Sequence, residues 1–299
     1  MERPHLDASL LNRILQRLSI GSAPNADLDG LRAVYSAWCD TIPFDNTAKL
    51  IALRTGAKGN LPGIEPVEFF ERFLAHGAGG TCWPTSNALF ALLDDLGFDA
   101  RRVAGSMRDT GFIGHASVKV RIDGTDWLVD SSMQTHIPLP LTAEVFVSDD
   151  PVYGVEVERV DETHMIWWDL PPNATYIPCR LLVDDVSHDY YVERYEASRD
   201  RSPFNERVYV RRNFPGAMLV IHGNLRLWKT STGVQASELR RSQLEESLRT
   251  EAGISSEMLD DLRRCGAIDA SLQPSASPPP PAVTGPPPSK RHSAMEASR

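Results

Sequence analysis

The spacing of apolar residues changes once along this chain, near residue 98, and this change limits the folds that the chain can adopt. Before it, apolar residues recur at the three- to four-residue spacing of amphipathic helices. Four segments show that spacing: 6–20, 28–42, 65–77 and 81–98. After it, residues alternate in the manner of strands over 99–107, 115–123 and 125–133. Helices followed by strands predict an α+β fold, with a helical first part and a later barrel or sheet.

The later part of the chain continues this pattern and then loses it. Strand-like runs follow at 178–184, 206–214, 217–225 and 225–231, and residues 236–266 have the composition of one or two closing helices. From about residue 267 the chain is rich in Pro and Ser and poor in large apolar residues. Such a segment buries too little apolar surface to offset its ordering entropy, so we predict a disordered tail over 267–299.

Composition excludes several classes of protein. The formal net charge of -9 and the pI near 5.4 disfavour binding to nucleic acid, which needs clustered Lys and Arg. No apolar run approaches the roughly 20 residues that span a bilayer, and the polar start MERPHLDASL does not look like a signal peptide. We therefore expect a cytoplasmic protein that binds neither nucleic acid nor membrane.

Four widely spaced cysteines, without a CxxC pair, predict free thiols and no bound metal. Among them, only Cys82 has neighbours that suggest chemistry. It follows Gly79, Gly80 and Thr81 and begins a predicted helix, where unpaired amide N–H groups and the positive end of the helix dipole favour a thiolate. The backbone N–H of Cys82 is a candidate oxyanion donor. A cysteine after two glycines is a weak signal alone, because most cysteines are small core residues.

A nucleophilic thiol needs a base, and the base needs a group that orients it. His115 begins one predicted strand and Asp130 ends the next, with the turn pair Asp123-Gly124 between them. In an antiparallel hairpin centred on that turn, the two positions fall nearly opposite each other. We therefore predict that Cys82, His115 and Asp130 form a catalytic triad.

These residues and several motifs resemble the arylamine N-acetyltransferases. The sequence AGGTC carries the two glycines and the cysteine of the family pattern, IPFDN at 42–46 is similar to the family's Ile-Pro-Phe-Glu-Asn, and LGF at 96–98 keeps the family's offset from the cysteine. The separation of 15 residues between His115 and Asp130 also matches. The stretch 198–228, SRDRSPF through LRLW, is similar to the family's strands that follow a Ser-rich motif. The resemblance covers roughly residues 6 to 265.

The resemblance implies a fold and a set of partners. It implies a helical domain over 1–100 that carries the cysteine, a β-barrel domain over 101–200 and an α/β lid over 201–266, on a cysteine-protease/transglutaminase-like core. It also implies an acyl-CoA donor, acetyl-CoA in the first place, a small amine acceptor such as an arylamine, and no tightly bound cofactor.

The resemblance also suggests substrate contacts. Phe44 is a candidate by analogy, although core packing is the more common role for a Phe in this setting. Trp83, next to the nucleophile, is as compatible with core packing as with lining an acyl or aromatic pocket. Ser131 and Met133 lie in the loop that borders the acyl group in the family.

Several departures from the family surround the triad. Ala78 replaces the family's Arg before the two glycines, Pro84 replaces a polar residue, and Ser86 replaces Asn. Asn87 is one position late, about 100° around a helix, so it cannot take over that role. After Asp130 the chain reads Ser-Ser-Met-Gln over 131–134 instead of Val-Gly-Phe-Gly.

Three functions are compatible with these residues. The first is an acyl-CoA-dependent N-acyltransferase. The second is an amide synthase or hydrolase that takes a larger or carrier-bound acyl chain, for which the rebuilt loop could make room. The third is a catalytically silent binding protein on the same fold. The intact triad favours the first two.

Overall fold

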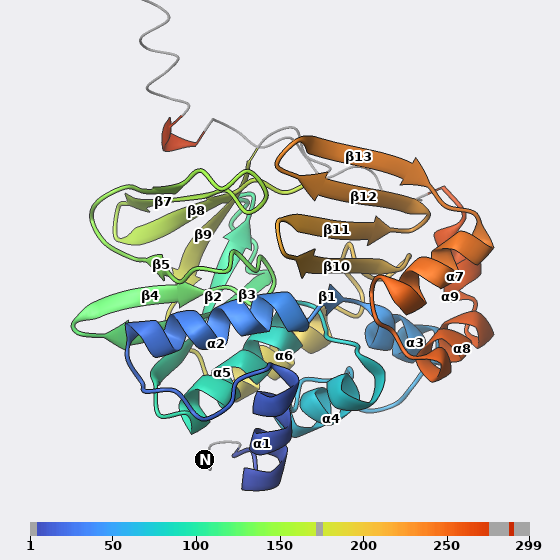
Figure 1. Cartoon of the computed structure of the whole chain (residues 1–299), viewed down its shortest axis with the longest axis horizontal. Helices are drawn as coiled ribbons and strands as arrows, with labels where there is room; N and C mark the ends of the chain where they lie inside the picture. Colours follow the sequence, from blue (N-terminus) through green and yellow to red (C-terminus); the bar gives the residue numbers. More distant parts are fainter. Residues whose placement is uncertain (1–4, 172–175, 275–286, 290–299) are drawn as a thin grey trace, which may run out of the picture.

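The structure, a computed structural model, describes residues 5–171, 176–274 and 287–289. Figure 1 shows helices and sheets in one mixed architecture, which confirms the predicted α+β class. The helices are α1 (Ala8–Arg17), α2 (Leu28–Thr41), α3 (Thr47–Thr55), α4 (Pro66–His76), α5 (Cys82–Asp95), α6 (His188–Ala197), α7 (Arg241–Thr250), α8 (Ser256–Arg264) and α9 (Ala267–Ser271). The strands are β1 (Phe44–Asp45), β2 (Asp99–Met107), β3 (His115–Ile122), β4 (Thr125–Val129), β5 (Leu139–Pro140), β6 (Phe146–Ser148), β7 (Val155–Val160), β8 (Thr163–Trp168), β9 (Ile177–Val183), β10 (Tyr209–Phe214), β11 (Ala217–His222), β12 (Leu225–Thr230) and β13 (Gly233–Glu238).

The first helices begin and end where the local sequence provides caps. The carboxylates of Asp7 and Asp27 accept hydrogen bonds from the first turns of α1 and α2. Pro66 begins α4, where a missing N–H breaks no intrahelical bond, and Gly77 ends that helix with a φ of 69°. The sequence predicted α1 and α2 from the spacing of their apolar residues, and α4 also from Pro66 and Gly77, all of which are local signals.

The strands form two antiparallel sheets. One has eight strands in the order β5-β4-β3-β2-β9-β8-β7-β6, and the other has five in the order β1-β10-β11-β12-β13. β1 pairs with β10, so the helical first part of the chain contributes a strand to the sheet built by the last part. Figure 1 shows α7, α8 and α9 gathered at the end of the five-stranded sheet that lies away from the eight-stranded sheet.

Helix α5 lies at the centre of this arrangement. It contacts β2 and β3 on one side and α4 and α6 elsewhere, and residues 82–93 are all buried. A helix that is apolar around most of its circumference is suited to such an interior position. The cysteine at its first position is therefore held by a rigid, enclosed element.

Several segments differ from the predicted elements, and strands β1, β5, β6, β7 and β8 were not predicted. Residues 236–238 were predicted to be helical but belong to β13, an exposed edge strand, and the closing helices begin only at α7. Helices α3 and α6 were not predicted. Helix α9 lies in the segment that we predicted to be a tail without structure. This helix forms because Ala267 and Ile268 are buried in the core cluster of the five-stranded sheet. Most of the remaining tail, residues 275–286 and 290–299, lies outside the described residues.

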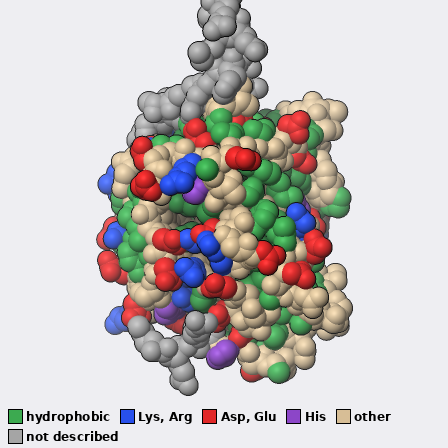
Figure 2. Space-filling model, turned by 90° about the vertical axis from the view of Figure 1, so that its left-hand side faces the viewer, with side chains coloured by type: hydrophobic (Ala, Val, Ile, Leu, Met, Phe, Trp, Pro, Cys, Tyr) green, Lys and Arg blue, Asp and Glu red, His purple; other side chains and the backbone are tan. Residues whose placement is uncertain are grey.

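The surface carries charges of both signs, and the cysteines are free thiols. In Figure 2, acidic and basic side chains are interspersed over the face shown. Among the described residues, no helix combines the length and the apolar character that crossing a membrane requires. All four cysteines are free thiols, as predicted. The division into domains at residues 100, 200 and 266 stays a prediction.

Candidate active site

The loop before Cys82 is fixed by the backbone and side chain of β1. The Asp45 amide donates to the carbonyl of Gly80 (3.1 Å), and the Asp45 carboxylate accepts from the amide of Gly79 (2.6 Å). A Cβ atom at Gly79 would lie 1.9 Å from the carbonyl oxygen of Pro43, so only glycine fits there. Cys82 follows as the first residue of α5, and its own amide has no intrahelical partner.

His115 and Asp130 lie on neighbouring strands and contact each other. The register pairs Val118 with Val129, which makes Asp130 a diagonal neighbour of His115 on the same face of the sheet. The sequence had predicted positions nearly opposite, and the diagonal arrangement still brings His115 Nε2 within 2.7 Å of Asp130 Oδ2. The exposed fractions of Cys82, His115 and Asp130 are 7%, 3% and 0%.

The charges of these groups are coupled. Burial alone lowers the pKa of His115, but the charge and hydrogen bond of Asp130, together with a hydrogen bond and charge from Cys82, outweigh it and raise that pKa to about 10. Burial likewise raises the pKa of Asp130, and the contributions of His115, of the Ser117 hydroxyl and of the Met133 amide outweigh it, so the net shift is downward. The geometry therefore favours an imidazolium beside an ionised carboxylate.

Asp130 is saturated with hydrogen bonds. Its Oδ2 accepts from His115 and from the Ser117 hydroxyl (2.5 Å), and its Oδ1 accepts from the amides of Ser132 (2.9 Å) and Met133 (2.8 Å). Sequence reasoning missed Ser117. The available signal was its position two residues after His115, which places both side chains on one face of β3.

The loop that follows Asp130 is attached to α2 by Tyr35, another residue that sequence reasoning missed. The Tyr35 hydroxyl donates to the Asp130 carbonyl (2.8 Å) and accepts from the amides of Asp130 and Thr135 (3.2 Å each). Tyr35 is fully buried. No local pattern connects a tyrosine on α2 to a loop some 95 residues later, so only the tertiary structure reveals this support.

The polar substitutions on α5 and in the loop form a hydrogen-bonded group of their own. Ser131 Oγ donates to Thr85 Oγ1 (2.9 Å) and lies 2.9 Å from Ser86 Oγ, which in turn donates to the carbonyl of Ala116 (2.8 Å). Ser131 thus joins the loop to α5, and its role toward substrate stays a prediction.

Asn87 lies apart from that group. Its amide donates to the carbonyl of Ile64 (2.6 Å), and its oxygen accepts from Arg102 Nε (2.6 Å). This position agrees with the helical offset in the sequence. Ala78, which replaces the family's Arg, is fully buried in the apolar cluster under the five-stranded sheet.

The other predicted substrate contacts lie close to the cysteine. Phe44 and Trp83 belong to the same buried cluster as Cys82. The ring of Phe44 packs edge-on against Phe204 and Tyr209 at 5.2 and 5.7 Å between centroids, and the ring of Trp83 packs edge-on against Tyr191 at 5.1 Å. Met133, in the loop after Asp130, is partly buried. Their roles toward substrate stay predictions.

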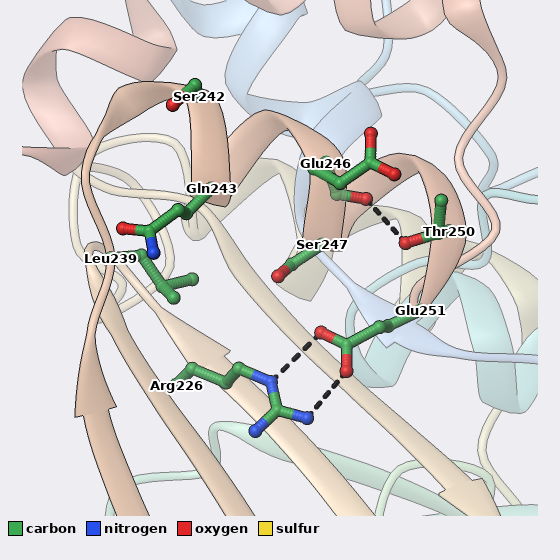
Figure 3. A pocket seen from close by; sticks show the side chains of 8 residues that line it. All are labelled: Arg226, Leu239, Ser242, Gln243, Glu246, Ser247, Thr250 and Glu251. Carbon is green, nitrogen blue, oxygen red and sulfur yellow. Dashed lines mark hydrogen bonds and ion pairs between the residues drawn. The ribbon is translucent and has the colours of Figure 1, made fainter.

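Two shallow pockets on the surface do not involve these residues. One lies between β12 and α7 and is shown in Figure 3; it is lined by Arg226, Leu239, Ser242, Gln243, Glu246, Ser247, Thr250 and Glu251. The other lies along α1 and the loop after it. Neither pocket includes a member of the proposed triad.

Comparisons with known proteins agree with this fold. A family model described as N-acetyltransferase matches residues 27–259, most of the chain. The solved arylamine N-acetyltransferase of Mycobacterium smegmatis superposes with a TM-score of 0.74 at 19% identity, over 87% of this chain and 98% of that one. The Mycobacterium marinum arylamine N-acetyltransferase in complex with CoA superposes with a TM-score of 0.73 at 17% identity, over 88% and 98%.

The match to the N-acetyltransferase model places this chain among the acyltransferases. The chain belongs to the arylamine N-acetyltransferase family. It is also similar to proansamycin X synthase of Amycolatopsis mediterranei, at 31% identity over 121 residues, which are 39% of this chain. That match spans 45% of the synthase's length.

Proposed function

We propose that this protein is an acyl-CoA-dependent N-acyltransferase that carries its acyl group, in the first place acetyl, on Cys82. Membership of an N-acetyltransferase family supports this function, as does the likeness to a family structure that contains CoA. The single observation that carries the proposal is the burial of Cys82, His115 and Asp130 in one enclosed site, where Asp130 bonds to His115 and where Asp130 and Cys82 outweigh burial and raise the pKa of that imidazole.

The first half-reaction forms the acyl-enzyme. With its proton on His115, the Cys82 sulfur attacks the carbonyl carbon of the acyl-CoA, and the N–H of Cys82 stabilises the negative oxygen of the tetrahedral intermediate. The bond between the carbonyl carbon and the CoA sulfur then breaks, and the CoA sulfur takes the proton from His115. The product is a thioester on Cys82 and a neutral His115.

The second half-reaction transfers the acyl group. The nitrogen of an amine acceptor attacks the thioester carbon, and His115 takes the proton that the nitrogen loses. The bond to the Cys82 sulfur breaks, which releases the amide and restores the protonated His115 beside the sulfur. Asp130 orients the imidazole and stabilises its positive charge in both steps.

An amide synthase that uses a larger acyl chain is the second candidate. The likeness to proansamycin X synthase favours it, together with the replacement of the family's Val-Gly-Phe-Gly by residues 131–134. The two candidates share the acyl-enzyme and differ in the acyl group. The chain length of the donor that reacts fastest with Cys82 would separate them.

Intact mass spectrometry tests the proposed function. The protein is incubated with acetyl-CoA and with a series of longer acyl thioesters, and then with an arylamine. We expect the mass to rise by one acyl group and to return to its starting value when the amine is added. Cys82→Ala should show no adduct, whereas Cys265→Ala, which removes a partly exposed thiol at the end of α8, should behave as the parent protein.

The opposite results are equally informative. Adducts that persist in Cys82→Ala would place the nucleophile elsewhere. If no thioester reacts and iodoacetamide leaves Cys82 unmodified at neutral pH, the protein is a binding protein on an acyltransferase fold, which was the third function compatible with the sequence.

A further inference from the structure

Arg211 is a buried cation that pairs with no carboxylate in the part of the chain that the structure describes. It lies on β10, directly across from Phe44 of β1, and only 2% of its surface is exposed. Within the described residues, neither its Nε nor its Nη2 has a hydrogen-bond partner. Removing a guanidinium from water is costly unless another group compensates the charge. A buried guanidinium that the fold retains at this cost is therefore a candidate for a functional role.

The surroundings of Arg211 connect it to the proposed active site. Its guanidinium carbon lies 5.8 Å from the centre of the Phe44 ring, and its Nη1 lies 3.8 Å from the sulfur of Met133. Phe44 and Met133 are two of the four residues that the sequence predicts as substrate contacts. The negative charge of Asp130 also acts on Arg211, but Asp130 already accepts four hydrogen bonds. Asp130 therefore has no lone pair left for this guanidinium.

The unpaired edge of Arg211 is the edge that binds carboxylates. Nε–H and Nη2–H point the same way and match the two oxygens of a carboxylate. The chain itself shows the pairing: Arg226 donates from Nε and Nη2 to the two oxygens of Glu251 at 2.9 and 2.5 Å (Figure 3). Arg180 pairs with Asp109 in the same way, at 2.8 and 2.9 Å.

We propose that Arg211 binds a carboxylate of the substrate, so that this enzyme acts on a substrate that carries a free carboxyl group. The carboxylate comes either from the acceptor, as in an aminobenzoate, or from the acyl group, as in a dicarboxylic acyl thioester. This inference rests on the proposed function for its assignment of the ligand as a substrate. The ligand's binding can be measured without any turnover.

The test uses full-length Cys82→Ala protein, which cannot be acylated at position 82, and isothermal titration calorimetry. The acceptor arm compares 4-aminobenzoate with its methyl ester, and the donor arm compares succinyl-CoA with butyryl-CoA. We expect the acid to bind more tightly than its neutral partner in one arm. In the Cys82→Ala protein, the further substitution Arg211→Met should weaken binding of that acid by roughly 10- to 100-fold. The affinity for the neutral partner should not change.

Three controls distinguish a carboxylate site at Arg211 from a general loss of charge or of folding. Arg226→Met makes the same change in the same sheet, away from Phe44 and Met133, and should leave both affinities unchanged. Arg211→Met should unfold at the same temperature as the parent or a higher one, because the charge that it removes is uncompensated. Arg211→Lys keeps the positive charge but lacks the two parallel N–H donors of the guanidinium, so it should lose most of the preference for the acid.

Equal affinities for the acid and its neutral partner in both arms would overturn the inference. A loss of both affinities in Arg211→Met, together with a lower unfolding temperature, would also overturn it, because that result would indicate a structural role for Arg211. The two proposals fail separately. If acid binding depends on Arg211 but acyl thioesters give no adduct, only the transferase function is wrong. If the adduct forms and the acid is not preferred, only the carboxylate site is wrong.

Discussion

At the scale of single residues, the protein's chemistry depends on how strongly His115 is held in its charged form. A buried imidazole would ordinarily be neutral near pH 7, because burial disfavours the charge. Here Asp130 and Cys82 reverse that effect and raise the pKa of His115 to about 10. The same contact holds the pKa of Asp130 below its ordinary value. Each member of the pair thus stabilises the charge of the other.

This coupling predicts how stability varies with pH. The pKa of His115 rises from 6.5 to about 10 on folding, so its contribution is complete below about pH 6.5 and is lost as the pH rises toward 10. The pKa of Asp130 falls from 3.8, so its contribution is present above that value and is lost in stronger acid. Urea unfolding of the parent and of Asp130→Asn should differ most between pH 4 and 6.5 and less at pH 10. A difference that does not change with pH would contradict this pairing.

At the scale of elements, the loop after β4 takes its shape from α2. The backbone groups of Asp130 and Thr135 are satisfied by one hydroxyl, that of Tyr35. Together with the Ser131 hydroxyl, which contacts Thr85 and Ser86 of α5, the Tyr35 hydroxyl fixes this loop relative to the helices. The strand supplies Asp130, and a helix from another part of the chain determines where that carboxylate lies.

Removal of that hydroxyl should therefore be costly. In Tyr35→Phe, the Asp130 carbonyl and two amides lose a buried partner, and we expect the free energy of unfolding to fall by about 1–3 kcal/mol. The measurement is urea unfolding monitored by circular dichroism. Tyr190→Phe, on the half-buried side of α6, should change the value by less than about 0.5 kcal/mol. An equal effect of the two substitutions would show that the hydroxyl of Tyr35 does not support the loop.

At the scale of the whole molecule, the helical first part of the chain and its last part are joined through the five-stranded sheet. β1 from the helical part pairs with β10, and the cluster beneath the sheet contains Ala78, just before the glycine loop, together with Ile268 of α9. The Ser271 hydroxyl accepts from the amide of Val208 (2.9 Å), just before β10. The last helix therefore contributes to the same core that supports the loop of Cys82.

A substitution in α9 should reveal this connection. Ile268 is fully buried, and Ile268→Ala is expected to lower the free energy of unfolding by about 2–5 kcal/mol, through lost burial and the remaining cavity. Asp269→Ala, on the exposed side of the same helix, should cost less than about 1 kcal/mol. Thermal or urea unfolding measures both. If Ile268→Ala had no more effect than its neighbour, α9 would not be part of the core.

Much of the fold could be predicted because the signals were local. The helical spacing of apolar residues in α1 and α2, the alternation in β2 and β3, and the turn at Asp123-Gly124 each depend on residues close in sequence. Strand β8 was missed for the opposite reason, since residues 165–168 are all buried and a strand buried on both faces lacks alternation. Helix α9 was missed because composition describes a long window, and five residues with a buried face do not change it.

The candidate site divides in the same way. The sequence by itself determined the triad candidates, because a cysteine at a helix start and a hairpin with His and Asp on one face are set by spacing along the chain. Only the tertiary structure decided that Tyr35 holds the loop and that the fork of Arg211 stays unpaired beside Phe44 and Met133. Those facts depend on which side chains from distant segments meet in the interior, and buried hydrogen bonds and charges are determined by that meeting.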